Sequence, residues 1–196
     1  MRKEISTSLY WGLLHGMNDM IAGFLLMHYT WQNDSQASFI ALLTYSLLAF
    51  GGQLPLGIWV DRQQNLKAFG QVAIFCLILG AACSFQNVFL AIVLAGIASA
   101  GIHVIGGAIC LQLNDEKVTP LGIFTAPGIA GLALGGFLGH LAIGWIMLPA
   151  ASVFILYFLL AKNGWPTYVA KNKMQEELFD AHDWLMILLL LIMTLR

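Results

Sequence analysis

Charged residues are scarce in this sequence. Asp, Glu, Lys and Arg make up 10% of its 196 residues, and 59% of the residues are hydrophobic. A soluble domain carries about 25% charged residues, so this composition excludes a soluble domain and a disordered chain. Three cysteines, an odd number, give no disulfide framework. Nine basic residues against ten acidic ones leave a net charge of −1, which excludes a nucleic-acid-binding surface.

The few charged residues leave long uncharged segments between them. No Asp, Glu, Lys or Arg occurs in residues 35–60, 68–114 or 118–161. Because a helix needs about 20 mostly apolar residues to cross a bilayer, the first segment holds one span and the other two hold a pair each. The segment Leu9–His28 adds another, interrupted by Asp19. The sequence therefore predicts an all-α, polytopic membrane protein. Its six transmembrane helices are expected near Leu9–His28, Ser38–Val60, Ala68–Phe85, Val88–Leu113, Leu121–Leu138 and Leu141–Ala161.

The positions of the basic residues predict the orientation of these helices. Apart from Arg196 at the end of the sequence, every Lys and Arg falls at the N terminus, between spans 2 and 3, between spans 4 and 5, or after span 6. The opposite loops contain none. Since basic loops stay in the cytoplasm, we expect the N terminus and the loop after span 6 to be cytoplasmic.

The C-terminal part of the sequence differs from the rest. Residues 1–161 form the expected six-helix bundle, and residues 162–183 form a polar stretch that we expect to be a cytoplasmic loop. The uncharged segment Trp184–Leu195 covers about 18 Å as a helix, too little for a hydrocarbon layer of about 30 Å. Residues 184–196 are thus a truncated or an interfacial seventh helix. Leu185–Met193 has no polar face, which favours truncation.

Polar residues inside the spans are the best candidates for a functional site, because they are costly in a membrane. Asp19 is the only acid deep inside a predicted span, with Asn18 beside it and His15 four residues earlier. Residues four apart share one face of a helix, so His15 and Asp19 can share a proton. This pair suits a proton relay or a solute clamp. The alternative is a structural contact to a neighbouring helix.

The loop between spans 2 and 3 carries a recognisable motif. Gly57 is followed four residues later by Asp61 and Arg62. This arrangement resembles the signature loop of the major facilitator superfamily, although Gln64 and Asn65 replace the second glycine and a basic residue of that pattern. A loop that only sets the topology is the alternative.

Three other segments extend the resemblance to nearly the whole chain. They are the His15–Gly23 and Gly101–Gly107 segments and the proline–glycine segment Thr125–Gly131. These are similar to helices 1, 4 and 5 of the branch related to fosmidomycin-resistance transporters, and the final residues resemble the start of its seventh helix. The chain therefore resembles the N-terminal half of such a transporter.

The resemblance implies a fold and a function. It implies two inverted three-helix repeats, in which helices 1 and 4 line the pathway and His103 in helix 4 faces it. The alternative for His103 is an imidazole bonded to a neighbouring carbonyl. Gln53 then either touches the cavity or satisfies backbone groups freed by Pro55. Gly57, Asp61 and Arg62 form a gating loop that acts against a second transporter half, from the same gene product or another chain. The expected function is secondary active transport of a small solute across a bacterial inner membrane. The expected coupling ion is the proton.

Other motifs bear on competing functions. The sequence contains no GxxxxGK[ST], HExxH or GxSxG pattern. We therefore expect that the protein is not an enzyme and that it has no cofactor and no resident metal. One alternative is a non-transporting half that acts as an assembly partner. Another is a His/Asp metal permease, which requires that His15, Asp19 and His103 converge on one ion.

Small residues recur four positions apart in several spans. Gly96 and Ala100 are one such pair, and Gly131 and Gly135 are another. Small residues at this spacing let neighbouring membrane helices approach closely. The sequence therefore predicts tight helix packing at these positions.

Overall fold

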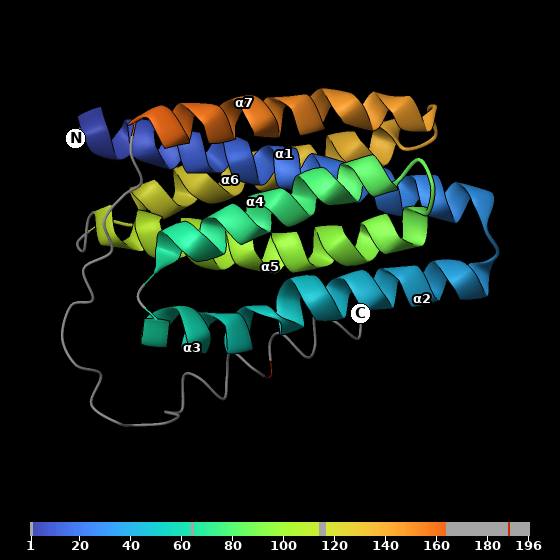
Figure 1. Cartoon of the computed structure of the whole chain (residues 1–196), viewed down its shortest axis with the longest axis horizontal. Helices are drawn as coiled ribbons and strands as arrows, with labels where there is room; N and C mark the ends of the chain where they lie inside the picture. Colours follow the sequence, from blue (N-terminus) through green and yellow to red (C-terminus); the bar gives the residue numbers. More distant parts are fainter. Residues whose placement is uncertain (1, 64, 114–116, 164–187, 189–196) are drawn as a thin grey trace.

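The computed structural model describes residues 2–63, 65–113, 117–163 and 188, and these residues form helices and turns without a strand. The all-α class is therefore confirmed (Figure 1). In chain order the elements are α1 (Arg2–Gln32), α2 (Ser35–Ser46), the π-helical turn η1 (Leu47–Gly51), α3 (Gln53–Gln63), α4 (Leu66–Cys83), α5 (Val88–Leu113), α6 (Thr119–Leu138), the 3₁₀ turn η2 (Ile143–Ile146) and α7 (Met147–Asn163).

Five helical segments are long and apolar enough to cross a membrane. They are Ser35–Gln63, Leu66–Cys83, Val88–Leu113, Thr119–Leu138 and Ile143–Leu160. The chain is thus compatible with an integral membrane protein. Helix α1 is long enough but is not among the five, since His15, Asn18 and Asp19 lower its apolar content. A sixth span at α1 and the two inverted repeats stay predictions.

The long helices lie alongside one another as a bundle (Figure 1). Helix α1 packs along α6 and also against α5, and α4 packs along α5. The α1–α6 contact depends on glycines: a Cβ added at Gly131 would meet the backbone of Gly16, and one added at Gly135 would meet the backbone of Met20. The close packing predicted for this pair is confirmed. It fixes the face of α1 that carries His15.

The second long helix is interrupted near its middle. At η1 the helix widens into a π turn, and Gly52 N–H bonds the carbonyls of Leu47 and Leu48. The Gln53 side-chain amide donates to the carbonyl of Ala49 at 2.8 Å. Gln53 thus bonds a carbonyl of its own helix four residues earlier, and neither of the two roles weighed for it is tested by this contact.

The predicted gating loop begins at the end of α3. Asp61 and Arg62 are exposed in its last turn. A Cβ added at Gly57 would meet nothing within 4 Å, so Gly57 does not serve close packing within the described part of this chain. The cytoplasmic loop expected after Asn163 and the apolar segment 184–196, apart from Leu188, lie outside the described residues.

Candidate functional site

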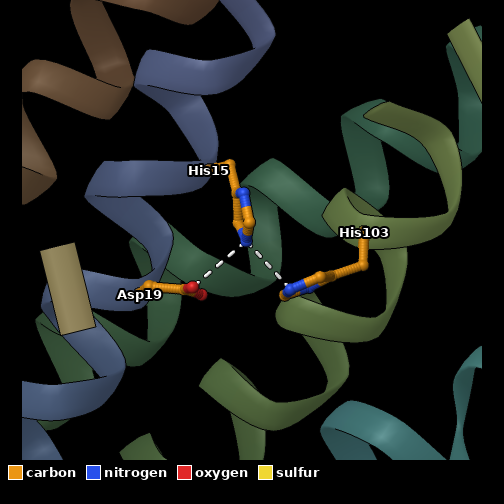
Figure 2. Close-up of side chains that lie close together, drawn as sticks. All are labelled: His15, Asp19 and His103. Carbon is orange, nitrogen blue, oxygen red and sulfur yellow. Dashed lines mark hydrogen bonds and ion pairs between the residues drawn. The ribbon is translucent and has the colours of Figure 1, made fainter. Parts of the chain in front are cut away.

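Three polar side chains from two helices meet inside the bundle. His15 and Asp19 project from successive turns of α1, and His103 projects from α5 toward them (Figure 2). His15 Nε2 lies 3.1 Å from Asp19 Oδ2 and 2.9 Å from His103 Nε2. One ligand atom from each residue lies within 4.8 Å of the others. We call these three residues the His–Asp cluster.

The other ring nitrogen of each histidine faces a backbone carbonyl. His15 Nδ1 donates to the carbonyl of Phe124 at 3.0 Å, and His103 Nδ1 donates to the carbonyl of Ser99 at 2.7 Å. Because a carbonyl only accepts, both Nδ1 atoms carry a hydrogen. Two neutral rings of this tautomer would face each other with two Nε2 lone pairs. In this tautomer a bond at 2.9 Å between these atoms needs a proton on one Nε2, which makes that imidazole a cation. The Ser99 hydroxyl lies 3.2 Å from His103 Nδ1, and if it donates there, the His103 hydrogen sits on Nε2 and both rings are neutral.

The Asp19 carboxylate is held from its other side by neutral groups. Asn18 Nδ2 donates to Asp19 Oδ1 at 2.7 Å and to Ser99 Oγ at 3.2 Å. The Tyr45 hydroxyl from α2 also donates to Ser99 Oγ, at 3.3 Å. Asn18 is fully buried, and its Oδ1 has no hydrogen-bond partner. These contacts fix the carboxylate beside His15 without supplying a positive charge.

Helix α6 forms the wall behind His15. The Phe124 ring stacks on the His15 ring with centroids 4.6 Å apart and an angle of 20° between the planes. A Cβ added at Gly128 would collide with the His15 imidazole, and one added at Gly106 in α5 would collide with the Phe124 ring. Both glycines therefore make room for this stack.

The His–Asp cluster is remote from the ends of its helices. At 1.5 Å rise per residue, Asp19 is at least about 20 Å from either end of α1, and His103 is about 15 Å or more from either end of α5. Asp19 is 9% exposed, and the buried charged and polar side chains of the described residues include no second acid and no Lys or Arg. A buried carboxylate requires a counter-charge or a proton. In this cluster the counter-charge can come from a protonated histidine or from a cation bound between the histidines.

The structure brings together four of the residues predicted from the sequence. His15, Asn18, Asp19 and His103 form one connected group. Gln53 bonds the backbone of its own helix instead, and Gly57, Asp61 and Arg62 lie at and near the end of α3.

Some residues of the site were missed by the sequence analysis. They are Tyr45, Ser99, Phe124 and Gly128. Ser99 precedes His103 by four residues, the same spacing as His15 and Asp19, and this pattern could have revealed it. The role of Phe124 depends on how α6 packs against α1, which no local pattern encodes.

Substituting Gly128 with alanine is expected to break the bond between His15 and His103. The new methyl group would occupy the place of the His15 ring, which must then rotate away from Phe124 and His103. Solid-state NMR on ¹⁵N-labelled histidine would detect the loss of the hydrogen bond between the two imidazoles. Gly122→Ala is the matched control on the same helix, because a Cβ there meets nothing within 4 Å. An unchanged histidine spectrum in Gly128→Ala would contradict the described packing.

Chemically, the His–Asp cluster offers the ligand atoms of a cation site, with His15 and Asp19 buried and His103 half-buried. Its donors are two imidazole nitrogens and one carboxylate. Among the described residues, no Lys or Arg is buried beside them.

Comparisons with protein-family models, with curated proteins and with solved structures found no match to this chain.

Proposed function

We propose that this chain is one half of a secondary active transporter that moves a small solute by alternating access, with the proton as the coupling ion. The observation that carries the proposal is the His–Asp cluster itself, a buried site that joins α1 to α5. Ionisable residues inside membrane helices mark ion and solute pathways, and transporter sites lie near the middle of the bilayer. The resemblance to the major facilitator superfamily supports the same function.

The geometry suggests how a proton is coupled to helix movement. With one proton shared, His15 and His103 bond each other across α1 and α5, and the resulting positive charge balances Asp19. When that proton leaves, the two Nε2 lone pairs repel each other and Asp19 loses its counter-charge. The contact between α1 and α5 is therefore favourable in one protonation state and unfavourable in the other. Such a difference shifts a two-state equilibrium between helix arrangements.

A second half completes the transporter in this proposal. It is the rest of the same gene product, another chain or a second copy of this one. Asp61 and Arg62 are exposed at the end of α3, which suits residues that meet another half at a gate. Solute would pass between the two halves, along α1 and α5.

Proton flux measured in reconstituted vesicles tests this function. The full chain is placed in liposomes that contain a pH-sensitive dye, and a panel of sugars, amino acids, organic acids, organic cations and metal cations is added outside. We expect at least one compound to change the internal pH in vesicles with protein and not in empty vesicles. His15→Gln is expected to abolish that signal because it removes the central member of the His–Asp cluster.

The control for this experiment is another histidine. His140 is exposed, and its Nδ1 bonds the carbonyl of Phe137 in its own turn at 2.7 Å. It lies outside the His–Asp cluster, so His140→Gln should leave the flux unchanged. If no compound gives more flux than empty vesicles do, transport by this chain alone or by two copies of it is wrong. The chain would then be better described as a non-transporting assembly partner.

A further inference from the structure

The donor atoms of the His–Asp cluster are those of a transition-metal site. Two imidazole nitrogens and one carboxylate oxygen suit zinc and its neighbours in the first row. Ligand atoms bound tetrahedrally at 2.0–2.1 Å are about 3.3 Å apart. The pairs centred on His15 Nε2 are separated by 2.9 Å and 3.1 Å. Shifts of a few tenths of an ångström would bring these two pairs to ligand spacing. The ligand atoms of Asp19 and His103 lie within 4.8 Å of each other and would close around the ion.

The contacts behind the donor atoms match a metal site as well. Histidines that bind metals almost always donate their second ring N–H to a carbonyl or a carboxylate, and ligating carboxylates are themselves hydrogen-bonded. His15 and His103 both donate through Nδ1 to carbonyls, and Asp19 accepts from Asn18. Both imidazoles thus present Nε2, the nitrogen that faces the other ligands. A proton relay does not require this arrangement of all three outer contacts.

The surroundings favour a cation over other occupants. The elements around the cluster contribute Tyr45, Ser99, Phe124 and the ring of Phe50, none of them a positive charge. A metal ion would lie between the two Nε2 atoms and Asp19 Oδ2. A divalent ion there would bind Asp19 directly and relieve the repulsion between the two Nε2 lone pairs.

We propose that His15, Asp19 and His103 bind a divalent first-row transition-metal cation, such as Zn²⁺ or Co²⁺, in the place of the shared proton. Three protein ligands leave a fourth position open, which suits an ion that must also leave the site. The cation is then the solute class of the transporter, and this last step rests on the proposed function; the binding site does not. Oxygen-preferring Mg²⁺ and Ca²⁺ fit these nitrogen donors poorly.

Titration of the purified full chain with Co²⁺ tests the site. The affinity tag is removed, and visible absorption reports the cobalt coordination. We expect one tightly bound Co²⁺ per chain, displaced by Zn²⁺ and not by a hundredfold excess of Mg²⁺. Because loss of an outer contact alone weakens metal sites by 10–100-fold, His103→Gln should weaken Co²⁺ binding by about 100-fold or more. Asn18→Ala, which keeps all three ligands, should weaken it by about 10-fold.

Controls separate loss of the site from loss of the fold. His140→Gln removes an exposed histidine and should bind Co²⁺ like the unmodified chain. Circular dichroism and gel filtration of each variant check that the helices remain. A cobalt spectrum without a sulfur-to-cobalt charge-transfer band would exclude the thiols of Cys76, Cys83 and Cys110 as ligands. The metal site is overturned if His103→Gln binds Co²⁺ as tightly as the unmodified chain does. It is also overturned if the unmodified chain binds no Co²⁺.

Vesicle experiments distinguish this site from the transport function. Entry of Zn²⁺ into vesicles, detected with a trapped fluorescent chelator, would support both. Tight Co²⁺ binding without Zn²⁺ entry keeps the metal site and overturns the cation as transported solute. Proton-coupled movement of another solute by a chain that binds no Co²⁺ keeps the transport function and overturns the metal site.

Discussion

In the proposed transporter, replacement of Asp19 by asparagine is expected to lower strongly the solute accumulation driven by a pH gradient. Asp19 is the only buried acid among the described residues, and its Oδ2 lies 3.1 Å from His15 Nε2. Asparagine has nearly the same shape but no charge, so the imidazolium that the proposed coupling requires would lose its counter-ion. Coupling free energies between sites correspond to factors of about 5–150. We expect the accumulation ratio to fall by a factor in this range.

Accumulation and passive exchange should respond differently in this variant. Vesicles with an imposed pH gradient report coupled accumulation, and vesicles with equal pH on both sides report exchange of the solute identified by the flux experiment. We expect coupled accumulation to fall far more than exchange in Asp19→Asn. The matched control is Asp34→Asn, because Asp34 is exposed and its side chain only caps α2, through Ala37 N–H at 2.8 Å. Asparagine caps helices equally well.

Unchanged pH-driven accumulation in Asp19→Asn would show that Asp19 does not carry the coupling. The effect must also exceed that of Asp34→Asn, which makes the same chemical change outside the His–Asp cluster. A loss of helical content in Asp19→Asn would place the defect in the fold. Removing a buried charge whose partner remains destabilises some proteins, so circular dichroism of this variant accompanies the transport measurement.

The helices were predictable because charge and apolar length are local properties of the sequence. A charged residue costs so much inside a bilayer that its position nearly fixes where a span ends. Residues 68–114 were expected to hold two spans joined by a short turn, and α4 and α5 meet between Cys83 and Val88. The π turn at Leu47–Gly51 was not predicted, because it requires knowing how the backbone bonds rearrange around Gly52.

The site was predictable only within one helix. The spacing of four between His15 and Asp19 implied a shared helix face, and the structure gives a contact of 3.1 Å. The inclusion of His103 came from the resemblance and not from spacing, since it lies on another helix. Phe124 and Gly128 could not be inferred, because their contribution depends on the contact between α1 and α6.

The contact between α1 and α6 is also where a single methyl group should have the largest effect on stability. A Cβ at Gly131 would meet the carbonyl and Cα of Gly16, which are backbone atoms that no side-chain rotation can move. Helices must then separate along a contact that membrane proteins stabilise mainly by close packing. Overpacking costs about 1–3 kcal/mol. We expect Gly131→Ala to lose this much free energy of unfolding, measured by denaturant titration in detergent.

The neighbouring glycine Gly136 provides the control, since it lies on the same helix and a Cβ there meets nothing within 4 Å. Alanine forms helix better than glycine by about 1 kcal/mol, so Gly136→Ala should be neutral or slightly stabilising. The two variants share this gain, and their difference isolates the contact with Gly16. Equal stability of the two variants would mean that α1 and α6 are farther apart than described. His15, which projects from α1 toward α6, would then lose the support of Phe124 as well.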